Sequence, residues 1–448
     1  MRLAFIKHNI PPGLGLMSAV LYGIFAYRPV RTEIITLLFL YGALFFLFYL
    51  LVRTGKEKER RLTGIGIGLR AVFLFALPNL SQDFYRFIWD GELLLKGINP
   101  YLYLPDDLVQ KAGFSIANMQ ELYEGMGALS ASHYSNYPPL SQFIFALASV
   151  FSGKILGAVI LMRLLLILAD LGVLYFGRKL LRHLKLPEYY IFWYFLNPFI
   201  LIELTGNLHF EGVMLFFLLW SLYALLRHKL FLSATLLACA VSVKLIPLLF
   251  LPLFLHRLGW KKLVLYGAVT GLAVLLLFLP FWSEISIHHY KKTLGLWFTN
   301  FEFNASWYYL LREAGFGGES YPLIRYYGRI MPWVILVMIM LTAFFRHNKN
   351  PVQLITAMLL ALSFYYFTAT TVHPWYIALL IGLSVFTRYR FPLVWSAVIM
   401  LSYEAYSTPG FRENLWLIAL EYTVVYGVMA RELFLKRSTR WSLLRKND

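Results

Sequence analysis

Long apolar stretches recur along the whole 448-residue chain and constrain its fold more than any other feature. A helix that crosses a bilayer needs about 20 mostly apolar residues. Apolar side chains occur on all faces of these stretches, as expected where lipid is the solvent. The stretches fall near 11–27, 33–52, 63–80, 155–177, 189–205, 208–226, 262–282, 327–345, 352–371, 374–387, 391–405 and 414–434. We therefore expect an all-α polytopic membrane protein, a single transmembrane domain over residues 1–448 with about 12–14 spanning helices.

The composition excludes other classes of protein. Only 14% of the residues are charged, whereas a soluble chain has about 25%, so too little polar surface exists to cover a water-soluble enzyme. The 59% hydrophobic content excludes a disordered chain. A single cysteine, Cys239, allows neither an intrachain disulfide nor a cysteine-rich zinc site.

The net charge of +18 is interpreted as a topology signal and not as a nucleic-acid surface, because Lys and Arg collect on cytoplasmic loops of membrane proteins. Roughly 26 of the basic residues lie on one side if both termini are cytoplasmic. The basic segments are 53–61, 178–185, 227–229, 257–262, 346–349, 388–390 and 431–446. The chain is therefore predicted to bind membrane lipid and no nucleic acid.

This topology places two conditions on the chain. Segment 138–153 must lie along the membrane or dip into it, and segment 231–256 must enter and return as two short helices with Lys244 near the turn. The outer side then holds 81–154, the expected catalytic loop with juxtamembrane helices, and the second outer loop, 283–326. The shorter outer turns are 206–209, 372–374 and 406–413.

The first outer loop begins with charged residues at helical spacing. Asp83, Arg86 and Asp90 share a helix face, and Asp83 follows the end of an apolar stretch. A carboxylate at this depth is partly desolvated and has a pKa suited to a general base. Arg86 and Asp90 fit either a salt bridge at a helix end or a substrate contact. Tyr137, followed by two prolines, marks the entry into an interfacial helix and is a candidate substrate contact.

Polar residues inside apolar segments form the second set of candidates, because ionisable groups there are costly and tend to face a functional site. Glu203, Asn207 and Glu211 align if the backbone stays helical, and Asn207 fits interhelical hydrogen bonding equally well. His209 and Glu211 are candidate substrate-binding residues at an outer turn.

Two basic residues in apolar segments need partners. Lys244 has no carboxylate within 30 residues on either side, so its partner must come from a distant helix or from a ligand such as a lipid phosphate. Arg163 lies two helical turns before Asp170, and this spacing favours a structural pair between them.

An outer turn carries His373, Trp375 and Tyr376. Histidine can donate a hydrogen bond to a phosphate or a sugar oxygen, and the aromatic rings offer flat apolar faces to a sugar or a prenyl chain. The polar and aromatic segment 300–309 suits a lid or an acceptor contact. No His/Cys/Asp/Glu pattern has metal-ligand spacing, so we predict no metal and no cofactor.

Taken together, these motifs resemble a known family. Gln82-Asp83-Phe84-Tyr85-Arg86 through Gly97-Ile98-Asn99-Pro100-Tyr101, Tyr137-Pro138-Pro139-Leu140, Asn197-Pro198 to Glu211, Lys244-Leu245-Ile246-Pro247 and His373-Pro374-Trp375-Tyr376 occur in this order over roughly residues 63–390. They resemble the GT-C integral-membrane glycosyltransferases, most closely the family 87 polyprenyl-phosphate-mannose-dependent mannosyltransferases. A related loop occurs in the catalytic subunit of glycosylphosphatidylinositol mannosyltransferase I.

The resemblance implies a cell-envelope enzyme of the bacterial inner membrane, with its active site on the extracytoplasmic face. It implies transfer of mannose from a polyprenyl-phosphate donor to a glycolipid or polysaccharide, with Asp83 in the position of the catalytic base. Inversion then follows from a single displacement, with Lys244, His373 and Arg86 as candidates to stabilise the leaving phosphate. Where many relatives have Asp, this chain has Glu211.

Two alternatives remain at this point. A transporter or lipid flippase also combines many helices with buried charges, although this chain lacks the internal repeat that is typical of many transporters. The second alternative keeps the enzyme class and changes the sugar to glucose, arabinose or an aminosugar.

Overall fold

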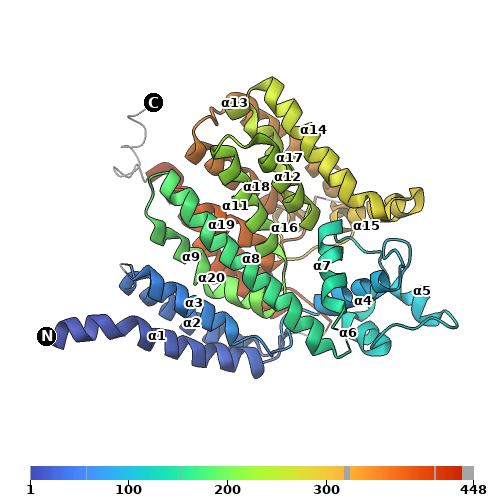
Figure 1. The fold of residues 1–448 in the computed structure, drawn as a ribbon, viewed down its shortest axis with the longest axis horizontal. Helices are drawn as coiled ribbons and strands as arrows, with labels where there is room; N and C mark the ends of the chain where they lie inside the picture. The colour runs from blue at the N-terminus through green and yellow to red at the C-terminus, as the bar shows by residue number, and fades with distance from the viewer. Residues whose placement is uncertain (1, 57, 152, 317–322, 408–409, 436–448) are drawn as a thin grey trace.

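The computed structural model describes residues 2–56, 58–151, 153–316, 323–407 and 410–435. Within these ranges the regular secondary structure is helical, and the only extended pairing is an isolated parallel bridge between Phe303 and Thr371. Figure 1 shows α1–α3 along one edge of a helical bundle and α4–α7 gathered at the end away from the N-terminus. The predicted all-α fold class is confirmed.

The helices fall into four groups along the chain. The N-terminal group contains α1 (Arg2–Tyr27), α2 (Ile34–Thr54) and α3 (Glu59–Ala71). The second group, called the outer block below, contains α4 (Asp83–Leu95), α5 (Pro105–Gln110), α6 (Met119–Ala131) and α7 (Pro139–Ser149). The third contains α8 (Ile155–His183), η1 (Glu188–Ile191), α9 (Phe192–Phe195), α10 (Pro198–Ile200), η2 (Leu201–Gly206), α11 (Glu211–Leu226), α12 (Leu230–Val243), η3 (Ile246–Phe254) and α13 (Leu255–Leu258).

The fourth group contains α14 (Trp260–Phe278), η4 (Leu279–Phe281), α15 (Glu284–Thr299), α16 (Trp307–Glu313), α17 (Leu323–Phe345), α18 (Pro351–Thr368), η5 (Pro374–Ile377), α19 (Ala378–Ser384), α20 (Phe391–Val398), η6 (Ile399–Tyr406), α21 (Leu415–Ala430) and η7 (Arg431–Leu435). Two of the short elements, η2 and η7, are π-helical, and the other η elements are 3₁₀ helices.

Six helices of the described residues are long and apolar enough to cross a membrane, and a seventh is added if one bent pair counts as a single span. They are Ile10–Tyr27, Ile34–Thr54, Ile155–His183, Trp260–Phe281, Leu323–Phe345 and Pro351–Thr368, with Pro198–Gly206 plus Glu211–Leu226 as the bent pair. The expected 12–14 spans are therefore too many by this criterion. Apolar runs such as 374–387 and 391–405 are divided into short helical pieces instead of forming one long helix.

Prolines explain where several of these apolar runs divide. Proline lacks the N–H that an α-helix interior needs, so it is favoured at the first helical positions. Pro198 follows Asn197, whose side chain accepts a hydrogen bond from the Phe199 N–H at 2.9 Å and caps α10. Pro247 leaves the Val243 carbonyl at the end of α12 without a helical donor. The Asn197 cap therefore divides stretch 189–205 and Pro247 divides stretch 231–256, although each is apolar along most of its length.

The two predicted short segments are confirmed as short helices. Among the described residues of 138–153 the one helix is α7, whose 11 residues are too few for a full crossing. Segment 231–256 breaks at Lys244, which has an extended backbone between α12 and η3. The Val243 carbonyl, which has no helical donor, accepts a hydrogen bond from Ser141 Oγ of α7 at 3.0 Å. This bond ties the outer block to the break at Lys244.

The buried arginines find partners that differ from the predicted one. Asp170 accepts a hydrogen bond from Arg70 Nε at 3.0 Å and another from the Tyr194 hydroxyl at 3.1 Å. Arg163 instead donates to the carbonyl oxygens of Thr205, Gly206 and Leu74 at 2.8–3.0 Å. The predicted Arg163–Asp170 pair is therefore wrong. The buried Thr205 and Gly206 carbonyls at the end of η2 accept hydrogen bonds from Arg163. Arg70 on the neighbouring helix α3 reaches Asp170 instead.

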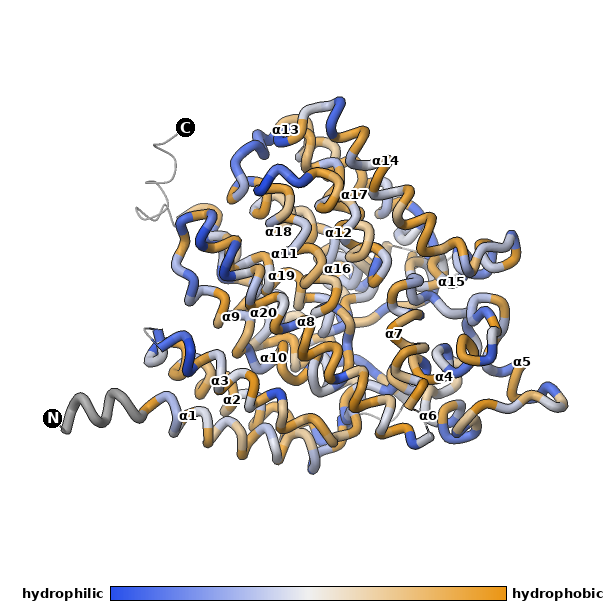
Figure 2. The backbone as a smooth tube through the Cα atoms, in the orientation of Figure 1, coloured by the Kyte–Doolittle hydropathy of each residue, from blue (hydrophilic) through white to orange (hydrophobic). Residues whose placement is uncertain are grey.

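Hydrophilic segments lie at several places on the surface of the bundle. Figure 2 shows them at the α2–α3 turn, at the end of α8 and around α13, and also within α4–α6 of the outer block. The segregation of the basic turns on one side of the membrane stays a prediction. The placement of both termini in the cytoplasm stays a prediction.

The Arg70–Asp170 pair gives a stability test, because both side chains are at most 1% exposed. Arg70→Met leaves an uncompensated buried carboxylate, and we expect a loss of about 3–5 kcal/mol, while Arg70→Met with Asp170→Leu recovers most of it. Thermal unfolding of the purified protein measures both. The matched control is Arg182→Ala at the exposed Arg182–Glu188 pair, with an expected cost of about 0–1 kcal/mol. Equal losses for Arg70→Met and Arg182→Ala would show that the buried Arg70–Asp170 pair does not stabilise the fold more than an exposed pair.

Candidate active site

Asp83 is the first residue of α4, and its environment leaves the carboxylate free. The segment before it is held by Asn207, whose Oδ1 accepts a hydrogen bond from the Leu80 N–H at 3.0 Å. A carboxylate in the first turn of a helix is stabilised by the helix dipole. Within the described part of the chain, the Asp83 carboxylate makes no hydrogen bond and no ion pair; only its backbone N–H does, to Ser81 Oγ.

The surroundings of Asp83 raise the pKa of its carboxyl group into the range that suits a general base. Desolvation by the surrounding protein raises its pKa to about 6, Lys244 and Arg31 lower it, and Glu211 raises it. A base with a pKa near the working pH is both deprotonated and basic enough to accept a proton. The predicted partial desolvation at the end of an apolar stretch therefore has a structural basis.

Lys244 and Glu211 form an ion pair between two helix ends. Glu211 begins α11, Lys244 follows the last residue of α12, and Lys244 Nζ donates to Glu211 Oε1. Lys244 Nζ also lies 4.6 Å from the centre of the Tyr376 ring. The Glu211 side chain is 1% exposed and the Lys244 side chain 27%, so the lysine is the accessible member. The prediction that a distant segment supplies a partner for Lys244 is confirmed.

The expected alignment of Glu203, Asn207 and Glu211 is wrong. The backbone is π-helical over η2, Leu208 has a φ of +63°, and the helices on either side differ in direction by 111°. Glu203 accepts a hydrogen bond from the Tyr403 hydroxyl at 2.8 Å, whereas Asn207 binds Leu80 and Glu211 binds Lys244. The break sends the three side chains to three different partners.

Aromatic stacking joins the two histidines of the prediction. Trp375 stacks on His209 with ring centres 3.7 Å apart and on His373 with ring centres 4.6 Å apart. Tyr376 meets His373 edge-on at 5.3 Å. The turn at 206–209 and the turn at 372–374 are thereby brought together beside Lys244, which contacts Tyr376.

His373 is neutral in this environment. Desolvation, with a smaller contribution from Lys244, lowers its pKa to about 3. Its Nδ1 is buried without a hydrogen-bond partner in the part of the chain that the structure describes. His373 can therefore supply a hydrogen bond to a phosphate, but no positive charge.

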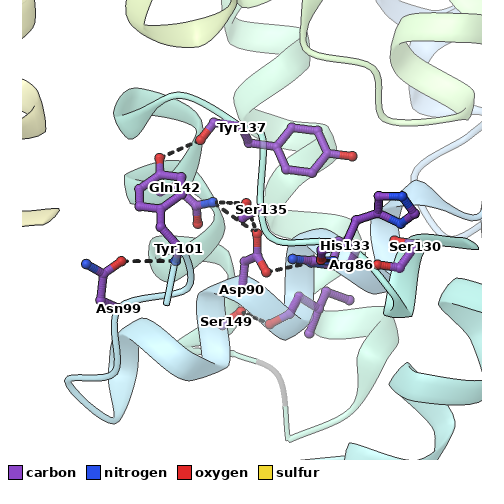
Figure 3. A network of polar contacts seen from close by, with 11 residues as sticks. Arg86, Asp90, Asn99, Tyr101, Ser130, His133, Ser135, Tyr137, Gln142 and Ser149 are labelled. Carbon is purple, nitrogen blue, oxygen red and sulfur yellow. Dashed lines mark hydrogen bonds and ion pairs between the residues drawn. The ribbon is translucent and has the colours of Figure 1, made fainter. Parts of the chain in front are cut away.

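Arg86 and Asp90 form the centre of a hydrogen-bond network that fastens the outer block (Figure 3). Arg86 donates to Asp90 at 2.7 Å and to the carbonyls of Ser130 and His133 at 2.7 and 2.9 Å. Asp90 also accepts from Ser135 at 2.5 Å and from Gln142 at 3.0 Å. Both carboxylate oxygens of Asp90 are thus bound by protein groups, which favours the structural alternative for this pair.

The same network places Tyr137. The carbonyl of Tyr137 accepts a hydrogen bond from the Tyr101 hydroxyl at 2.5 Å, and its ring packs edge-on against Phe87 of α4 with ring centres 5.0 Å apart. Gly91 allows α4 and α7 to approach closely, because a Cβ there would overlap Phe145 and Ser149 of α7. Tyr137 is therefore held at the start of α7, close to the Asp83 end of α4.

Two residues near Asp83 were not among the sequence candidates. Arg31 lies in the α1–α2 turn, and Tyr406 ends η6. The Arg31 guanidinium lies 4.8 Å from the centre of the Tyr406 ring, and its Nη2 donates to Gln82 Oε1 at 3.2 Å. One signal was available: if the N-terminus is cytoplasmic, the turn after the first apolar stretch lies on the outer side, where the positive-inside rule disfavours a basic residue such as Arg31.

Fold and site together define a polytopic membrane protein with a free carboxylate beside an ion-paired lysine at interrupted helices. Residues 10–258 match the model of the MptA_B family, described as alpha-(1->6)-mannopyranosyltransferase, N-terminal domain. Because the match covers more than half of the chain, the chain belongs to this family, which makes it a membrane glycosyltransferase and confirms the predicted resemblance. The matched range includes Asp83, Glu211 and Lys244, whereas His373 lies beyond it. A search of the curated proteins found no match.

The Asp90 network gives a test of the outer block. Asp90→Ala removes the acceptor of three buried hydrogen bonds, and we expect residues 130–142 to exchange their amide hydrogens at least tenfold faster, as loss of about 1–3 kcal/mol per orphaned donor implies. Hydrogen-exchange mass spectrometry measures this. The control is Glu124→Gln on α6, whose carboxylate accepts only an exposed hydrogen bond from Gln120. Unchanged exchange in Asp90→Ala would show that the network does not hold this segment.

Proposed function

We propose that this protein transfers mannose from a polyprenyl-phosphate-linked donor to a glycolipid or polysaccharide acceptor on the extracytoplasmic face of the membrane. The observation that carries the proposal is the free Asp83 carboxylate, with a pKa near 6, within electrostatic reach of the accessible Lys244. Membership of a family of alpha-(1->6)-mannopyranosyltransferases supports mannose as the sugar.

Asp83 acts as the general base in this proposal. An acceptor hydroxyl is a weak nucleophile, and it attacks the anomeric carbon more readily as its proton passes to a carboxylate oxygen of Asp83. The new bond joins the acceptor oxygen to the anomeric carbon, and the bond from that carbon to the phosphate oxygen breaks. The electron pair of the broken bond leaves with the lipid phosphate.

Lys244 stabilises the departing phosphate. One of its three N–H donors is occupied by Glu211, so two remain for phosphate oxygens, and the side chain is partly accessible. His373 adds a hydrogen bond from a neutral ring. Arg86 has a smaller part than the sequence suggested, because three protein acceptors already bind it.

A single displacement determines the stereochemistry. The acceptor attacks from the face opposite the leaving phosphate, so the anomeric configuration inverts. An α-linked product, as the family description names, then requires a β-linked donor. The prenyl chain of the donor stays in the bilayer. Trp375 is buried and stacks on His209 and His373, so in this proposal it positions the two histidines. The partly exposed Tyr376 is the aromatic residue left for the sugar or the first prenyl units.

Asp83→Asn tests the base directly. We expect mannose transfer to fall by at least about 10²-fold, because general-base catalysis contributes about 10²–10⁴-fold. The assay uses purified protein, β-linked polyprenyl-phosphate mannose and a membrane extract as acceptor, with glucose and arabinose donors in parallel. Asp107→Asn, an exposed acid of the same outer block, is the control and should keep full activity. Full transfer by Asp83→Asn would contradict the assignment of Asp83 as the general base. A preference for the glucose or arabinose donor would show that the transferred sugar is not mannose.

The pH dependence of transfer follows from the pKa of Asp83. The base must be deprotonated, so the rate is maximal above the pKa and is lost as the pH falls through about 6. We expect a tenfold fall for each further pH unit below the pKa, measured as kcat/KM for the acceptor. A rate that stays constant down to about pH 4 would show that a group with an ordinary carboxyl pKa limits the reaction.

Lys244→Gln tests stabilisation of the phosphate. We expect kcat/KM for the donor to fall by about 10- to 100-fold, since a charge-assisted hydrogen bond is worth about 1.5–3 kcal/mol. Lys244→Arg keeps the charge and should recover part of this loss. Because Lys244→Gln leaves Glu211 unpaired, Lys244→Gln with Glu211→Gln separates catalysis from stability. A double variant with wild-type donor kinetics would contradict the proposed role.

A further inference from the structure

The turn between α1 and α2 brings a basic residue to the candidate active site from outside the outer block. Arg31 Nη2 donates a hydrogen bond to Gln82 Oε1 at 3.2 Å, and the guanidinium stacks over Tyr406 at 4.8 Å from the ring centre. Gln82 directly precedes Asp83, and its Nε2 donates to the Met126 carbonyl at 2.9 Å. Arg31 and α6 therefore hold the residue next to Asp83 from two sides.

The charges around Asp83 are not equivalent. Lys244 and Glu211 act on it with opposite signs and are bound to each other, so much of their effect cancels. Arg31 has no carboxylate partner among the described residues. The other titratable groups that face Asp83 are the phenols of Tyr137, Tyr376 and Tyr406, which are neutral at physiological pH. Of the two positive charges that act on the Asp83 carboxylate, Lys244 has the larger effect but is paired with Glu211. Arg31 is the one without a carboxylate partner in the described part of the chain.

We propose that Arg31 is a positioning residue for the transfer reaction, which fixes the start of α4 through its hydrogen bond to Gln82 and holds a positive charge next to the Asp83 end of that helix. Arg31 contacts no reacting atom in this proposal. The Tyr406 ring holds the guanidinium by a cation–π contact, so the α1–α2 hairpin and η6 complete the site that α4, α11 and α12 begin. The inference rests on the proposed role of Asp83 as the base.

The experiment compares pH profiles of mannose transfer. In Arg31→Gln we expect the acidic limb of kcat/KM to move upward by about 0.5–1 pH unit. At pH 6 the rate, taken as a fraction of each protein's own plateau, should then be about two- to fivefold lower in the variant than in the wild type. Arg31→Lys keeps the charge and should return the limb toward its wild-type position. Arg28→Gln removes an exposed charge from the same turn and should not move the limb.

The Tyr406 variants provide a second, independent measurement if Arg31→Gln does not fold. Tyr406→Leu removes the ring face and should move the acidic limb upward, whereas Tyr406→Phe keeps the face and should not. A lower rate with an unmoved limb in both Arg31→Gln and Tyr406→Leu would mean a merely structural role and overturn the inference. Full activity of Asp83→Asn would instead overturn the proposed function, so the two failures are distinguishable.

Discussion

The ion pair between Lys244 and Glu211 is the interaction on which the rest of the site depends. A charge in an apolar segment costs about 2.5–3.5 kcal/mol on insertion scales, so neither residue is tolerated there alone. Both sit where a helix is interrupted, Glu211 at the start of α11 and Lys244 at the end of α12. Their pairing joins these two ends, and Ser141 ties the same break to α7. The outer block is therefore tied to the helical bundle at the same break that carries the ion pair.

The outer block divides its charged residues between two tasks. Arg86 and Asp90 bind each other and the segment 130–142, so protein groups occupy most of their hydrogen-bonding atoms and hold the outer block together. Asp83, one turn earlier on the same helix, is left without a partner. A rigid network beside a free carboxylate is what a general base needs, because catalysis requires a fixed position and an unoccupied proton acceptor. The aromatic turn around Trp375 lies beside Lys244, which contacts the adjacent Tyr376.

Features that depend on residues close together in the sequence could be predicted from the sequence. Hydropathy indicated the membrane class, the prolines indicated the start of α7 and the break near Lys244, and the cost of a buried ammonium required a distant partner for it. The motif order pointed to the family that the match over residues 10–258 shows. Fewer helices of the described residues meet the length and apolarity criterion for a span than were expected, because hydropathy measures apolar content and does not detect where the backbone stops being one continuous helix.

Pairings between distant segments were decided only by the tertiary structure. Helical spacing put Asp170 with Arg163, but Arg70 on another helix satisfies it, and the π-helical break separates Glu203 from Glu211. The position of Arg31 next to Gln82 and Asp83 could not be predicted from the residues around Arg31 in the sequence, which indicated only the side of the membrane expected for its turn. Burial of charge is costly wherever it occurs, so sequence was enough to show which residues need partners. Which partner each one finds depends on the helix ends that packing brings within hydrogen-bond distance, and that distance is a property of the fold.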